Sequence, residues 1–147
     1  MRGSRAAGSE RRSELDEAAI QEMISLAKKA SAMAYCPYSK FPVGAVVLAT
    51  SGRMYAGCNV ENAAYGDTIC AERGAIMQMV AGGDQEISVV VIYTPTEVAS
   101  SPCGSCRQVI NEFGPQARIV SVCDNGDRID APLNDLLPGA FGPRNLA

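Results

Sequence analysis

The chain is 147 residues long, with 47% hydrophobic and 20% charged residues and a formal net charge of −3. This length suits one domain and excludes two full cores, the composition argues against wholesale disorder, and the acidic balance argues against charge-driven binding of duplex DNA. There is no histidine, which excludes Ser–His and Cys–His catalytic pairs and histidine-dependent metal sites within this chain. A catalytic proton carrier must therefore be Glu, Asp, Lys, Tyr or Cys.

The first residues form a polar segment distinct from the rest. Residues 1–12 are small and polar with four arginines, and we expect a disordered tail there. Residues 13–147 are then a single domain. No apolar run approaches the ~18 residues of a membrane span, and the first residues lack the apolar core of a secretory signal, so we expect a cytoplasmic protein.

The first half of the domain predicts one helix and one hairpin. Ser13 is a candidate N-cap, and the apolar stripe that follows predicts a helix of about five turns that Pro37 ends. The apolar run at residues 43–49 predicts a buried strand, and residues 54–60 predict a second strand after a tight turn. The two strands should form an antiparallel hairpin.

The second half alternates between helical and strand patterns. The predicted elements are a helix from Cys70 to the Gly82–Gly83 pair, a strand at residues 87–94, a helix at 103–113, a strand at 118–123, a turn at 124–127 and a short helix at 133–137. Strand–helix–strand crossovers imply that the last three strands run parallel, so the sheet is mixed. Helices on both faces give a three-layer α/β/α sandwich.

Three cysteines have the spacing of a metal site. Cys70 lies in a C-A-E sequence, and Cys103 and Cys106 lie in P-C-G-S-C. Thiolates favour Zn²⁺, and three protein ligands leave one tetrahedral position open, as in catalytic sites. The combination of C-x-E with P-C-x-x-C is the signature of zinc deaminases with three cysteine ligands. A structural zinc site and a redox dithiol are the alternatives.

Glu72 and two arginines complete this pattern. Glu72 is two residues from Cys70, so it need not bind the metal and can reach a metal-bound water instead. Three thiolates on Zn²⁺ sum to a charge of −1, which weakens the metal as a Lewis acid. Helix N-termini and Arg73, with Arg107 as a further candidate, can offset this charge around the sulfurs.

Five ordered segments make the chain similar to a known family. They are PYSKFPVGA (37–45), GCNVENAAYG (57–66), CAER (70–73), SPCGSCRQV (101–109) and LLPGAFGP (136–143). With these segments the chain, from about Ile20 to Leu146, resembles the small homotetrameric cytidine deaminases. The resemblance implies a mixed five-stranded sheet, a homotetramer and hydrolytic deamination of cytidine and 2′-deoxycytidine in pyrimidine salvage.

The resemblance also implies roles for individual residues around the metal. Cys70, Cys103 and Cys106 would bind one zinc ion per subunit, and Glu72 would carry protons between water, N3 of the base and the leaving amine. Arg73 would donate to the thiolates.

The remaining implied roles concern the nucleoside. Asn59 and Glu61 would hydrogen-bond the ribose hydroxyls, and Phe41 would stack on the pyrimidine. Backbone groups around Ala71 would read the base edge. In the tetramer, Tyr65 would approach a neighbouring subunit's site and Phe141 would close over one.

Other functions remain as alternatives at this point. A deaminase of a modified cytosine nucleoside such as blasticidin S shares the zinc motifs, but the N-x-E-N sequence at residues 59–62 favours a plain ribose diol. A polynucleotide deaminase would need a basic or aromatic strand-binding surface. A non-enzymatic zinc-binding domain would need a closed fourth position on the metal. The roles of Cys36, Cys58 and Cys123 are open.

Overall fold

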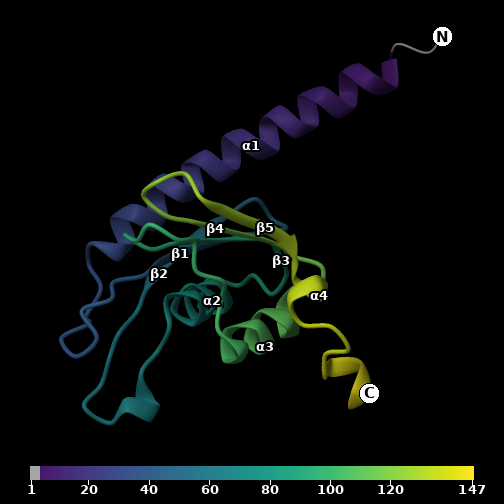
Figure 1. Cartoon of the computed structure of the whole chain (residues 1–147). Helices are drawn as coiled ribbons and strands as arrows, with labels where there is room; N and C mark the ends of the chain where they lie inside the picture. The colour runs from purple at the N-terminus through teal and green to yellow at the C-terminus, as the bar shows by residue number, and fades with distance from the viewer. Residues whose placement is uncertain (1–3) are drawn as a thin grey trace.

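The computed structural model describes the backbone of residues 4–147 and the side chains from Asp16 onward. The helices are α1 (Ser4–Ser31), α2 (Ala71–Ala81), α3 (Gly104–Phe113) and α4 (Leu133–Leu136), with 3₁₀ turns η1 (Tyr65–Asp67) and η2 (Pro143–Asn145). The strands are β1 (Gly44–Ala49), β2 (Met54–Cys58), β3 (Ile87–Tyr93), β4 (Arg118–Val122) and β5 (Arg128–Pro132) (Figure 1).

The five strands form one mixed sheet in the order β2-β1-β3-β4-β5. β3 and β4 pair in parallel, whereas β1 pairs antiparallel with both β2 and β3, and β4 pairs antiparallel with β5. The predicted hairpin and the common direction of β2, β3 and β4 are therefore confirmed. β5 was not recognised as a strand from its own sequence pattern, because it is a short edge strand in which charged residues alternate with Ile129 and Ala131.

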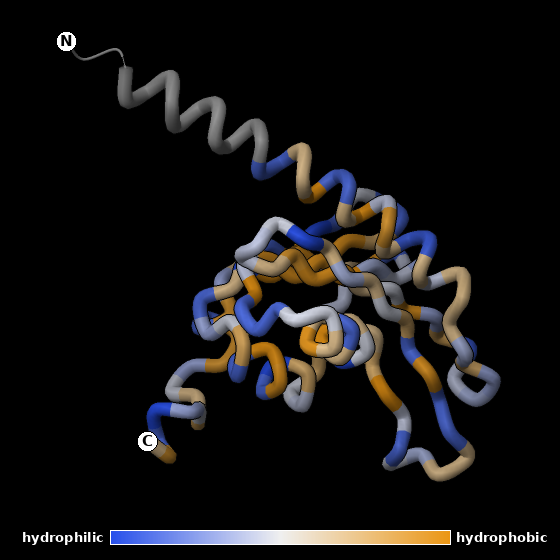
Figure 2. Tube along the Cα trace, turned by 180° about the vertical axis from the view of Figure 1, so that it is seen from behind, coloured by the Kyte–Doolittle hydropathy of each residue, from blue (hydrophilic) through white to orange (hydrophobic). Residues whose placement is uncertain are grey.

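Helices cover both faces of the sheet, which confirms the predicted three-layer sandwich (Figure 1). On one face, Ile20, Met23 and Ala27 of α1 pack in a cluster with Val46 and Val91 of the sheet. α2 and α3 cover the other face, where the second apolar cluster lies. Figure 2 shows the resulting concentration of hydrophobic residues along the strands between the two helical layers.

The boundaries of α1 differ from the sequence-based expectation. The helix begins at Ser4, inside the segment expected to be a tail, so Ser13 lies within the helix and is not its N-cap. Residues 4–12 include three arginines and two alanines, which favour helix, and no proline that would stop one. Residues 1–3 lie outside the described residues, and the division into tail and domain stays a prediction.

α1 also ends earlier than Pro37. Its last residue is Ser31, after which the chain turns so that Tyr35 pairs with the segment that follows β2. The Tyr35 amide donates to the Asn59 carbonyl oxygen at 3.0 Å, and the Glu61 amide donates to the Tyr35 carbonyl oxygen at 2.8 Å. This pairing brings the loop after α1 beside residues 59–61, where the candidate site begins.

α2 lies unusually close to β2. A Cβ atom on Gly57 would lie 2.6 Å from the Ala71 carbonyl oxygen and closer still to the Ala75 amide nitrogen. The two backbones are therefore in direct contact, and only glycine fits at position 57. This contact places the N-terminus of α2, which carries the first predicted metal ligand, beside the end of β2.

No helix in the described part of the chain is both long enough and apolar enough to cross a bilayer.

Candidate active site

The three predicted metal ligands come together at the N-termini of two helices. Cys70 is the N-cap residue of α2, Cys103 is the N-cap residue of α3, and Cys106 lies in the first turn of α3. The three Sγ atoms all lie within 4.8 Å of one another. Sulfurs bound to one tetrahedral Zn²⁺ stand about 3.8 Å apart, given Zn–S bonds of about 2.3 Å, so the donor set and its spacing fit this ion.

Hydrogen bonds and helix N-termini stabilise negative charge on this sulfur cluster. A guanidinium nitrogen of Arg73 donates to Cys70 Sγ at 3.4 Å and to the Thr68 carbonyl oxygen at 3.2 Å. The pKa of Cys70 is lowered to about 5, first by the neighbouring Cys106 thiol and then by Arg73. The Cys106 amide donates to Cys103 Sγ at 3.4 Å, so a backbone N–H at the N-terminus of α3 also points at the sulfurs. Metal ligation requires thiolates, so these contacts favour a bound cation.

Cys106 and Glu72 form the buried end of the site. The pKa of Cys106 is raised by its interaction with Cys70 and by burial. Its Sγ donates to the Glu72 Oε2 atom at 3.3 Å. The Glu72 side chain is only 5% exposed, and burial is the main reason that its pKa lies above the usual value. A carboxyl group with a raised pKa can hold a proton and release it, which is what a proton shuttle requires.

A cavity of about 410 Å³ opens in front of this cluster. It is lined by predicted site residues from four segments of the chain, namely Phe41, Asn59, Glu61, Cys70, Ala71, Glu72 and Cys103. This volume lies within the range of small-molecule sites. Two of the three predicted metal ligands, the predicted proton carrier and the predicted sugar and base contacts thus line one concave site.

Some lining residues were missed by the sequence analysis. Thr94 follows directly after β3, and Ser100 and Ser101 end the loop that leads to Cys103. A usable signal was present, because ligands bind at the carboxyl ends of parallel strands and Thr94 stands at such an end. The two serines gave no signal beyond their position before the P-C-x-x-C sequence.

Arg107 does not reach the sulfurs, which corrects one candidate role. Its guanidinium donates to the Leu136 carbonyl oxygen at 2.7 Å and to Ser101 Oγ at 2.9 Å, and its Nε donates to the Pro102 carbonyl oxygen at 2.8 Å. The side chain points away from the sulfurs because the loop before α3 offers it two oxygens and the end of α4 a third. Arg107 therefore holds the segment that leads into α3, and of the two candidate arginines it is Arg73 that donates to a predicted ligand sulfur.

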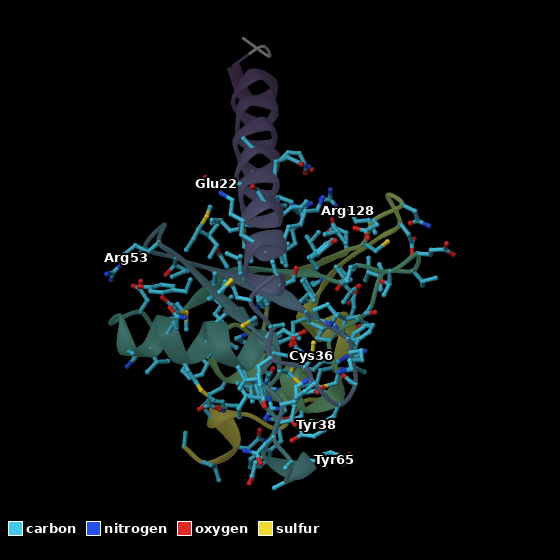
Figure 3. All side chains as sticks on the ribbon, turned by 90° about the vertical axis from the view of Figure 1, so that its left-hand side faces the viewer. Glu22, Cys36, Tyr38, Arg53, Tyr65 and Arg128 are labelled. Atoms are coloured by element: carbon cyan, nitrogen blue, oxygen red, sulfur yellow. The ribbon has the colours of Figure 1, made fainter. Side chains whose placement is uncertain are left out.

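Tyr65 and Phe141 lie outside the cavity of their own chain. Tyr65 is 74% exposed, and its ring stands edge-on to Tyr38 with the ring centroids 5.6 Å apart (Figure 3). Phe141 is 58% exposed, and its carbonyl oxygen accepts hydrogen bonds from Gln108 and Asn111. Both aromatic rings are directed to the surface, and their predicted role at a neighbouring subunit's site stays a prediction.

The fold and the thiol cluster define a class, namely zinc-binding proteins in which a buried carboxyl group stands beside the metal site. Residues 17–123 match the sequence profile of the family described as the cytidine and deoxycytidylate deaminase zinc-binding region. The chain belongs to this family.

Individual relatives and solved structures agree with this assignment. A cytidine deaminase of Sporosarcina psychrophila is 44% identical over 129 residues, which are 87% of this chain and 95% of the relative. One from Halalkalibacterium halodurans is 39% identical over 127 residues, 86% of this chain and 96% of the relative. The crystal structure of a cytidine deaminase from Burkholderia pseudomallei matches with a TM-score of 0.79 at 40% identity, covering 82% of this chain and 98% of that one.

Proposed function

We propose that this protein hydrolytically deaminates cytidine and 2′-deoxycytidine, giving uridine and deoxyuridine plus ammonia. The observation that carries this proposal is the position of Glu72, whose buried carboxyl group contacts a ligand thiol and also lines a nucleoside-sized cavity. Membership of the deaminase family and the cytidine deaminases among its relatives support it. Those relatives do not favour the alternative, a deaminase of blasticidin S.

The chemistry divides between the metal and Glu72. Zinc held by Cys70, Cys103 and Cys106 supplies a Lewis acid that lowers the pKa of the attacking water. Glu72 accepts the proton from this water as its oxygen forms a bond to C4 of the base, and delivers that proton to N3. In the second half of the reaction the carboxylate takes the proton of the new C4 hydroxyl and passes it to the exocyclic amine. The C4–N bond then breaks, ammonia leaves and C4 becomes the carbonyl carbon of the product. One carboxyl group serves both halves because its role reverses between addition and elimination.

The cavity walls suit the two parts of the nucleoside. We assign the base to the space between the Phe41 ring and Glu72, with backbone groups near Ala71 contacting its edge. We assign the sugar to Asn59 and Glu61, because a carboxylate accepts hydrogen bonds from two hydroxyls and an amide both donates and accepts. The pKa of Glu61 is lowered by hydrogen bonds from Ser39 and Tyr38, so the group stays ionised as an acceptor.

We further propose that the protein is a homotetramer of the cytoplasm. Large apolar side chains such as Tyr65, Met77 and Phe141 are exposed on the single chain, and contact with other subunits would cover them, which supports an assembly. All six cysteines are free thiols, which suits a reducing compartment. Light scattering of the purified protein tests the assembly, and a fully active monomer would contradict a site shared between subunits.

The test of the reaction is ammonia release from cytidine by the purified zinc-loaded protein, with Glu72→Ala as the blank. We expect turnover of cytidine and 2′-deoxycytidine by the wild type and none by the variant. Zinc binding without release of ammonia from either nucleoside would refute the proposed reaction, and turnover by the variant would refute the role of Glu72.

A further inference from the structure

The loop that carries Phe41 is held by the two side chains that we assign to the sugar. Residues 36–43, between α1 and β1, form neither helix nor strand. Glu61 Oε1 accepts hydrogen bonds from the Tyr38 amide at 3.0 Å and from the Ser39 amide at 3.1 Å. The start of this loop is therefore held by the Glu61 carboxylate.

Asn59 holds the other end of the same loop. Its Nδ2 donates to the Phe41 carbonyl oxygen at 2.8 Å, and its Oδ1 accepts from the Val43 amide at 2.8 Å. Asn59 is 8% exposed, so these hydrogen bonds are largely shielded from water. Each is therefore stronger than it would be at the surface, where water competes for the same groups. The backbone directly after the Phe41 side chain is thus fixed by one amide group, whereas the Glu61 carboxylate fixes the backbone before it.

The loop needs this support because its conformation is unfavourable by itself. Lys40 has a φ of 58°, in the left-handed region that residues with a Cβ rarely adopt. The Phe41 amide then donates to Ser39 Oγ at 3.0 Å, which completes a tight turn directly before the ring. A strained residue of this kind persists only where surrounding contacts determine the backbone. Without them we expect the loop to relax and the Phe41 ring, which is 40% exposed, to move from its place in the cavity wall.

These bonds occupy part of the hydrogen-bonding capacity of both side chains. One carboxylate oxygen of Glu61 is committed to the loop, which leaves Oε2 for a substrate hydroxyl. Asn59 has both its oxygen and one N–H committed, which leaves one N–H and one lone pair.

We propose that Glu61 and Asn59 are positioning residues for the pyrimidine base, which they orient through the backbone of the 36–43 loop and the Phe41 ring, independently of any hydrogen bond to the sugar. This inference rests on the proposed deaminase function. It predicts that removing Glu61 impairs a nucleoside that has no sugar hydroxyls for Glu61 to bind.

The experiment compares two variants of Glu61 on two nucleosides. Glu61→Ala removes the acceptor of the Tyr38 and Ser39 amides, whereas Glu61→Gln keeps an oxygen that can accept both and changes only the atom that faces the cavity. The substrates are cytidine and 2′,3′-dideoxycytidine, which lacks both ribose hydroxyls. For each pair, kcat and KM are measured from ammonia release. The inhibition constant of 2′,3′-dideoxyuridine against cytidine gives a second readout that needs no turnover of the dideoxy substrate.

We expect Glu61→Ala to lose about fivefold or more in kcat/KM on dideoxycytidine and to bind dideoxyuridine correspondingly more weakly, since base stacking on an aromatic ring is worth about tenfold or more in affinity. Both kcat and KM should change, because a displaced ring also misplaces C4 relative to Glu72. Glu61→Gln should stay within about twofold of the wild type on these dideoxy ligands and lose activity only on cytidine. Equal behaviour of the wild type and both variants toward the dideoxy ligands would overturn the inference.

A double variant separates positioning from general damage. In a Phe41→Ala background, Glu61→Ala should cause no further loss on dideoxycytidine, because there is no ring left to position. An additive loss in that background would show that Glu61 acts by another route and would also overturn the inference.

The controls address charge, folding and the underlying function. Glu22→Ala removes an exposed acid from α1, far from Tyr38 and Tyr65 beside the site (Figure 3), and should match the wild type in every assay. Thermal unfolding of each variant shows whether the fold is retained. A wild-type protein that does not deaminate cytidine would refute the proposed function itself. An active wild type whose Glu61 variants are impaired only on cytidine, and not on the dideoxy ligands, would refute the positioning role alone.

Discussion

Replacing Glu72 by Gln tests whether one buried carboxyl group moves the protons of the reaction. The side chain is 5% exposed, and Gln has nearly the same shape, so the variant should fold. The amide oxygen can still face Cys106, and none of the three sulfurs is removed, so zinc should stay bound. Gln cannot carry a proton, however. A positioned general acid or base contributes about 10² to 10⁴ in rate, and Glu72 serves both addition and elimination, so we expect kcat to fall by about 10⁴.

The assay for Glu72→Gln combines ammonia release under saturating cytidine with the zinc content of the same sample. The informative result is a large fall in kcat with zinc stoichiometry unchanged and KM changed little. A zinc-loaded variant whose kcat stays within about tenfold of the wild type would refute the reasoning, because another group would then be moving the protons. Loss of zinc from the variant would refute the separate statement that Glu72 is not needed to hold the metal.

Three further predictions concern the metal, the packing of α2 and the surface charges. Cys106→Ser should lose zinc, measured by atomic emission, whereas Cys123→Ser, outside the sulfur cluster, should keep it. Gly57→Ala should lower the free energy of unfolding in urea by about 3 kcal/mol through overpacking, and Gly66→Ala, which meets nothing within 4 Å, should not. The pKa of Asp130 is lowered by its hydrogen bond from Arg118, so its stabilisation is present above the unfolded pKa near 3.8 and is lost as the pH falls through the folded value. Asp130→Asn should therefore be up to about 1 kcal/mol less stable than the wild type near neutral pH, and this difference should shrink as the pH falls below about 4, measured by thermal unfolding across pH.

The metal cluster could be predicted from the sequence because its chemistry is local. The C-x-x-C pair shares one helical turn, so its spacing alone places two sulfurs together, and the C-A-E sequence places a carboxyl group beside the third. The buried strands were recognisable for a similar reason, since unbroken apolar runs are typical of strands covered on both faces. β5 lacked this pattern, because an edge strand has solvent on one side and tolerates charge.

The parts of the site that escaped prediction depend on contacts between distant segments. Arg107 follows a predicted ligand in the sequence, and for that reason it was a candidate to donate to the sulfurs. In the structure its guanidinium donates instead to the carbonyl oxygens of Pro102 and Leu136. Asn59 and Glu61 were predicted to contact the sugar, yet within the described residues their four side-chain hydrogen bonds all go to backbone groups near Phe41. Backbone partners of this kind leave no trace in residue type, so only the structure reveals them.

The contact between Gly57 and α2 has a consequence for how rigid the site is. Main chain touches main chain there, so no rotatable side chain separates the strand that leads to Asn59 from the helix that begins after Cys70. The backbone spacing between the sugar end and the metal end of the cavity is therefore set by the contact of a strand with a helix, and it does not depend on the rotamer of any side chain between them. Substrate binding should therefore need little rearrangement of the backbone that carries these groups, and the free-energy cost of reorganising the site should be small.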